Sequence, residues 1–135
     1  MRIGSPRRRS AGFTLIELII VCAIIGILTA AAVGNYRRGI VKAKEAALSQ
    51  DLYTMRTLIN QYFADKGKYP SDLNALVADH YLQAVPRDPI TDSTDTWVTV
   101  AAEMDDKDIS TEPGIADVRS GAAGTGLDGR SYAEY

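Results

Sequence analysis

Apolar residues follow two different patterns in the first half of the chain. Residues 13–33 form an apolar run of 21 residues in which Glu17 is the only charged side chain. An α-helix needs roughly 20 predominantly apolar residues to cross a lipid bilayer. The run therefore predicts a transmembrane helix that carries one unexplained carboxylate.

After Gly34, apolar residues recur every three or four positions, with charged and polar residues between them. This spacing is typical of an amphipathic helix. No proline interrupts residues 13–65, so we predict one continuous helix of about 50 residues whose second half packs against a small head. Its weakest point is Gly34 followed by Asn35, since glycine destabilises a helix by about 1 kcal/mol relative to alanine.

The remaining residues predict a small α+β head. Gly67 ends the long helix, and a short second helix is expected over residues 72–78, with Ser71 as its N-cap. Branched and aromatic residues predict the strands of a small antiparallel sheet at residues 97–101 and 115–119, with a third strand at residues 131–135. The fold class is therefore α+β, with a long N-terminal helix packed on this head.

Charge is unevenly distributed along a chain whose formal net charge is −2. Four arginines precede the apolar run, whereas from Arg87 onward four basic residues face eleven acidic ones. Phosphate binding needs clustered lysine and arginine, so nucleic acid is not expected as a partner. Cys22 is the only cysteine, which excludes an intrachain disulfide.

Catalytic motifs are not recognisable. His80 has no acid, cysteine or second histidine at the spacing of a metal site or a catalytic triad. The glycines at positions 124 and 126 lack the strand-to-helix context of a nucleotide-binding motif. We expect no enzyme activity.

The leader also differs from an ordinary secretory signal. Such a signal has an apolar region of roughly 7 to 15 residues followed by small residues at the cleavage site. Here Ser10, Ala11 and Gly12 precede a longer apolar run. A cut at these residues would leave the run attached to the mature protein. Basic residues flank both sides of the run, and we favour a cytoplasmic N-terminus because the long following segment can translocate largely regardless of its charge.

Residues 12–18 read GFTLIEL, after a short arginine-rich leader and before an unbroken apolar helix. This arrangement resembles the N-terminal signature of type IV pilins and type II secretion pseudopilins. The resemblance implies that a prepilin peptidase cuts between Gly12 and Phe13 and that Phe13 becomes N-methylated. The GKYPSDLNALV stretch from Gly67 and the VPRDP stretch from Val85 are similar to the major pseudopilins of type II secretion.

Cleavage would explain Glu17. The new α-amine of Phe13 would lie four residues ahead of Glu17, on the same helix face. In a staggered helical stack of subunits, the amine of one subunit can meet the Glu17 carboxylate of its neighbour. This pairing offsets the desolvation cost of both charges only when the subunits are in register. Glu17 is then an assembly checkpoint. The alternative is a carboxylate that reaches the headgroup region or is protonated.

The resemblance also implies a domain organisation and a function. Residues 1–12 would be the leader, 13–34 the transmembrane and filament-core helix, 35–66 the amphipathic helix, and 67–135 the head. The expected function is a structural subunit of a helical filament, the major pseudopilin that drives type II protein secretion. One alternative is the type IV pilin of a surface pilus, and one from another class is a single-pass membrane-anchored binding module that does not polymerise.

Partners and location follow from the same resemblance. The expected partners are other copies of the chain, minor pseudopilins or pilins, the prepilin peptidase, an inner-membrane assembly platform, and lipid before assembly. The expected location is the bacterial inner membrane, crossed once, with the head in the periplasm or outside. Assembly would transfer the chain to a periplasm-spanning or surface filament.

The C-terminal segment suggests a cation. It is rich in glycine with spaced acids, and Ca²⁺ takes about six to eight oxygen ligands from carboxylates and backbone carbonyls. Asp117, Ser120 and Asp128 are candidate ligands, and major pseudopilins bind calcium in a similar loop. The adjacent acidic pair of that family is reduced here to Asp128 alone, so a turn-rich loop without metal is the alternative. The acids at positions 105, 106 and 108 form another cation candidate, or a solvated surface.

Overall fold

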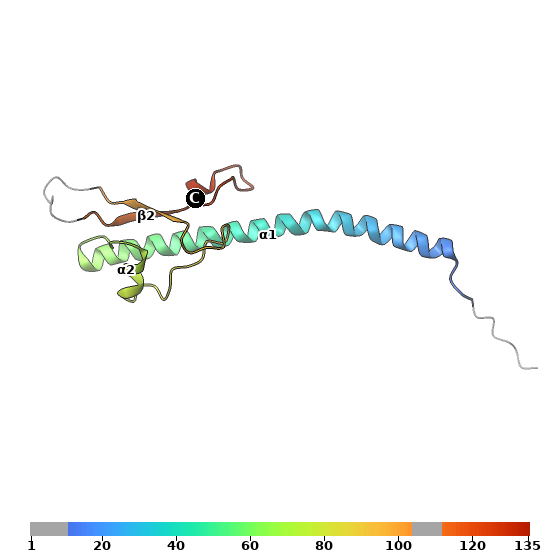
Figure 1. The fold of residues 1–135 in the computed structure, drawn as a ribbon, viewed down its shortest axis with the longest axis horizontal. Coiled ribbons are helices and arrows are strands. Elements are labelled where there is room, and N and C mark those ends of the chain that lie inside the picture. The colour runs from blue at the N-terminus through green and yellow to red at the C-terminus, as the bar shows by residue number, and fades with distance from the viewer. Residues whose placement is uncertain (1–10, 104–111) are drawn as a thin grey trace, which may run out of the picture. The chain divides into compact units, whose positions relative to one another are not determined.

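The computed structural model of the chain describes residues 11–103 and 112–135. A long helix, a short helix, two strands and a final 3₁₀ turn follow one another (Figure 1). This arrangement confirms the predicted α+β class. The elements are α1 (Leu15–Lys66), α2 (Leu73–Ala78), β1 (Trp97–Ala101), β2 (Ile115–Ser120) and η1 (Tyr132–Glu134).

The long helix α1 is continuous through Gly34 and Asn35. At its start, the side-chain oxygen of Thr14 accepts a hydrogen bond from the Glu17 N–H at 3.2 Å, which satisfies one free donor of the first turn. At its end, Gly67 has a φ of 69° and donates its N–H to the Phe63 carbonyl at 2.8 Å. Glycine adopts this left-handed conformation without a steric penalty, so the helix ends there.

The chain divides into two compact units, Met1–Arg38 and Gly39–Tyr135. Every described residue of the first unit is exposed. Its apolar window has a mean hydropathy of 2.7, and α1 is long and apolar enough there to cross a membrane. An apolar surface of this extent requires lipid or protein to cover it.

The second unit has its own hydrophobic core. One face of α1 is buried from Leu48 to Tyr62, as the amphipathic pattern predicts, whereas Tyr36 and Ile40 further toward the N-terminus are exposed. The helix α2 and the two strands lie alongside this part of α1 (Figure 1). They and η1 contribute the other core side chains, which include Leu73, Leu76, Ile115, Val118 and Tyr132.

The sheet contains two antiparallel strands, with Trp97 opposite Ser120 and Ala101 opposite Ile115. The predicted third strand at residues 131–135 is wrong. Ser131 instead accepts a hydrogen bond from the Ala133 N–H at 3.3 Å and begins η1. The N-cap of α2 is Asp72 rather than Ser71, because the Asp72 carboxylate accepts a hydrogen bond from the Ala75 N–H at 2.8 Å.

Candidate functional site

The N-terminal candidate site lies where the chain enters α1. Gly12 and Phe13 precede the helix and are both exposed. A peptide bond in such an exposed, non-helical segment is accessible to a peptidase. Glu17 lies in the first turn of α1, where a carboxylate interacts favourably with the helix dipole.

Phe13 and Glu17 lie on the same side of the chain. Together with Leu18 and Val21 they line one hollow on the surface of the first unit. A new amine at Phe13 would therefore lie on the face that carries the Glu17 carboxylate, as their four-residue spacing predicts. The cleavage, methylation and pairing of these residues stay predictions.

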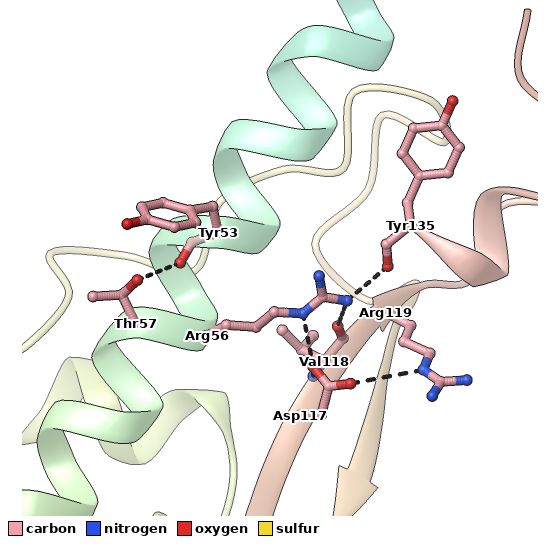
Figure 2. A network of polar contacts seen from close by, with 7 residues as sticks. All are labelled: Tyr53, Arg56, Thr57, Asp117, Val118, Arg119 and Tyr135. Carbon is pink, nitrogen blue, oxygen red and sulfur yellow. Dashed lines mark hydrogen bonds and ion pairs between the residues drawn. The ribbon is translucent and has the colours of Figure 1, made fainter. Parts of the chain in front are cut away.

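The three candidate calcium ligands each have a different partner. The Asp117 Oδ1 accepts a hydrogen bond from Arg56 Nε at 2.7 Å, and its other oxygen is 3.8 Å from Arg119 Nε (Figure 2). Asp128 Oδ2 accepts from Arg130 Nε at 2.6 Å, and this guanidinium holds the pKa of Asp128 below its usual value. Each carboxylate is thus already paired with a cation.

The third candidate ligand, Ser120, is buried. Its Oγ donates to Asp88 Oδ2 at 2.6 Å and accepts from the Ala122 N–H at 3.1 Å. Asp88 is also fully buried, and its other oxygen accepts from the Ile90 N–H at 2.8 Å. This hydroxyl therefore belongs to an internal hydrogen-bond network.

These residues do not fit a calcium site. Among residues 11–103 and 112–135, no group of three or more His, Cys, Asp or Glu side chains is arranged to hold a metal ion. Calcium needs about six to eight oxygens, and the oxygens of Asp117, Ser120 and Asp128 are committed to separate partners. The acids at positions 105, 106 and 108 lie outside the described residues.

Sequence reasoning missed three polar residues that organise the head: Arg56, Asp88 and Glu45. Glu45 Oε1 accepts hydrogen bonds from the Leu127 N–H at 2.8 Å and from the Tyr132 hydroxyl at 3.1 Å. Burial and this contact with Glu45 raise the pKa of Tyr132. An aspartate that bonds the backbone two residues onward, as Asp88 does, is a recognisable turn signal, whereas Arg56 and Glu45 resemble other polar helix residues.

Comparison with known sequences connects both parts of the chain to other proteins. The family described as the prokaryotic N-terminal methylation motif matches residues 7–33. The chain is 33% identical over 99 residues to the type II secretion system core protein G of Pseudomonas aeruginosa. The aligned region covers 62% of this chain and 70% of that protein. No solved structure matches the chain significantly.

Two further relatives show how far the similarity extends. Type II secretion system core protein G of Pectobacterium carotovorum is 30% identical over 102 residues, or 64% of this chain and 65% of that protein. Type IV major pilin protein PilA of Myxococcus xanthus is 37% identical over 76 residues, or 56% of this chain and 34% of that protein. The chain therefore spans less than two thirds of the length of either relative.

Proposed function

The chain belongs to the superfamily of type IV pilins and type II secretion pseudopilins, and from this membership we propose that it is the major pseudopilin of a type II secretion filament. The observation that carries this proposal is the extent of the similarity to the core G proteins. It covers 62% of this chain in the Pseudomonas aeruginosa comparison, which is more than the leader and α1 can supply. The similarity therefore includes part of the head.

The exposed first unit supports a filament role. Large apolar side chains from Phe13 to Val33 remain exposed, with Phe13 at 88%. Lipid would cover this surface while the chain is stored in the inner membrane, and neighbouring copies would cover it after extraction. The same helix then serves first as an anchor and later as the filament core.

Glu17 distinguishes a filament subunit from a simple anchor. A carboxylate at membrane depth costs roughly 2.5 to 3.5 kcal/mol even on insertion scales. A tether gains nothing from that cost, whereas a filament recovers it when the Phe13 amine of a neighbouring subunit pairs with Glu17. This difference favours a polymerising subunit over the anchored binding module.

The proposed partners follow from assembly. A prepilin peptidase would cut between Gly12 and Phe13 and methylate Phe13, and an inner-membrane platform would add the chain to a filament of its own copies with minor pseudopilins. The head would lie in the periplasm. The second candidate is a type IV pilin of a surface pilus, which the 37% identity to PilA favours.

The test is Glu17→Ala in a strain that lacks the chromosomal gene. We expect normal amounts of the variant in the membrane fraction and loss of filaments from sheared cell fractions. Thr29→Ala is the matched control and should assemble normally, since within residues 11–103 and 112–135 the Thr29 hydroxyl forms one hydrogen bond, to the Ile25 carbonyl of its own helix at 2.7 Å. Filaments of Glu17→Ala at the wild-type level would contradict the checkpoint role.

The deletion strain separates the two candidate functions. Loss of a pseudopilin should trap secreted proteins in the periplasm, which immunoblots of periplasmic and culture fractions would detect. Loss of a surface pilin should leave secretion intact and remove surface fibres. Normal secretion without this chain would therefore contradict the pseudopilin assignment.

A further inference from the structure

We propose that the guanidinium group of Arg56 is the internal cation of the head, and that the head consequently folds without calcium. Arg56 and its acceptors all lie in the second unit, and the contacts of Arg56 occupy oxygens that a calcium ion would need.

Arg56 joins three parts of the head. Its side chain extends from α1 toward β2 and the C-terminal segment (Figure 2). Nε donates to Asp117 Oδ1 at 2.7 Å. One terminal nitrogen donates to two main-chain oxygens, those of Val118 at 2.9 Å and Tyr135 at 2.6 Å.

The acceptors around Arg56 are of the kind that calcium prefers. They comprise one carboxylate oxygen of Asp117 and the main-chain oxygens of Val118 and Tyr135, and calcium binds carboxylate and main-chain oxygens. A guanidinium provides a permanent positive charge and several donors in one plane, so it can gather such oxygens without a metal. Hydrogen bonds from a charged donor are also shorter and stronger than neutral ones.

The exposure of Arg56 and Asp117 limits how much their ion pair stabilises the head. The side chains of Arg56 and Asp117 are 36% and 34% exposed, so solvent weakens their charge attraction. The main-chain oxygens of Val118 and Tyr135 accept hydrogen bonds from Arg56 independently of Asp117. The complete three-acceptor arrangement is therefore more important than the ion pair alone.

A second contact from α1 supports this assignment. Glu45 accepts hydrogen bonds from the Leu127 N–H and the Tyr132 hydroxyl. The C-terminal segment is thus held on α1 by a carboxylate at one point and by a guanidinium at another. These contacts fix the segment with the protein's own charged groups.

The test compares thermal unfolding of the full-length chain in detergent micelles with calcium and with a chelator. Trp97 is the only tryptophan, and its Nε1 donates to the Pro86 carbonyl within the head at 2.8 Å, so its fluorescence follows head unfolding. Calcium is used at about 5 mM, above the roughly 0.1 to 1 mM dissociation constants of extracellular calcium modules. We expect the same Tm in both conditions.

Arg56→Met should lower the Tm by roughly 5 to 10 °C, and Arg56→Lys should fall between this variant and the wild type. Arg119→Met is the matched control, since Arg119 is 51% exposed and only approaches Asp117 at 3.8 Å. It should change the Tm by less than about 2 °C.

Two results would overturn the inference. One is a wild-type Tm that falls by about 5 °C or more in chelator and returns with calcium. The other is an Arg56→Lys variant with the same Tm as Arg119→Met. The first comparison needs no substitution, so it applies even if Arg56→Met fails to fold.

Discussion

Ser120 and Asp88 form a buried hydrogen bond between β2 and the turn at residues 88–93. Their exposed fractions are 1% and 0%, and the two oxygens are 2.6 Å apart. Asp88 forms no salt bridge within the described part of the chain, so neutral donors alone solvate its carboxylate. Ser120→Ala removes the hydroxyl donor and leaves a smaller side chain in its place.

The loss of stability expected for Ser120→Ala follows from the burial of this hydrogen bond. A hydrogen bond to a charged group contributes about 1.5 to 3 kcal/mol to the free energy of unfolding. Its removal costs this whole amount where water cannot replace the donor. In a unit of about 100 residues, 1 kcal/mol changes the Tm by roughly 4 to 8 °C. We therefore expect Ser120→Ala to lower the free energy of unfolding by about 1.5 to 3 kcal/mol and the Tm by at least about 6 °C.

The assay is urea and thermal unfolding of the full-length chain in detergent, followed by Trp97 fluorescence. Ser49→Ala is the matched control, because Ser49 is exposed on α1 and alanine is a better helix former. It should be neutral or slightly stabilising. An unfolding free energy of Ser120→Ala within about 0.5 kcal/mol of that of Ser49→Ala would show that the Ser120–Asp88 hydrogen bond does not stabilise the head.

Two further substitutions test the core and its charge. Burial and the nearby charge of Asp88 raise the pKa of Asp51. The free energy of unfolding therefore decreases as the pH rises through that pKa and Asp51 becomes charged. Asp51→Asn should therefore raise the Tm at pH 7 and leave it unchanged near pH 3, and an equal change at both pH values would contradict this. Leu52 is 1% exposed, and Leu52→Ala should lower the unfolding free energy by about 2 to 5 kcal/mol in urea titrations. Leu127→Ala, at a side chain 56% exposed, should cost less than about 0.5 kcal/mol, and similar losses in both would refute the core assignment.

Local patterns made much of the fold predictable from the sequence. The apolar run and the three-to-four-residue spacing predicted α1 to within two residues at its N-terminal end, and Gly67 marked its C-terminal end. The N-terminal motif was also recognisable because its residues are contiguous. The third strand failed because the local hydrogen bond of Ser131 begins η1, a preference that strand propensity does not contain.

The organisation of the head required the tertiary structure. Arg56 contacts residues 61 and 79 positions away along the chain, so no local pattern could reveal its acceptors. Asp117, Ser120 and Asp128 lie close in sequence and suggested a shared ligand set, yet the fold directs them to Arg56, Asp88 and Arg130. Sequence spacing identified the polar residues but could not identify their partners.

The proposed filament function depends above all on how the N-terminus of the mature protein is processed. Mass spectrometry of the chain, purified both from inner membranes and from sheared filaments, would identify its first residue and any added methyl group. We expect a chain that begins at N-methylated Phe13 in both fractions. A chain that retains residues 1–12 in filaments, or that begins elsewhere, would contradict processing between Gly12 and Phe13.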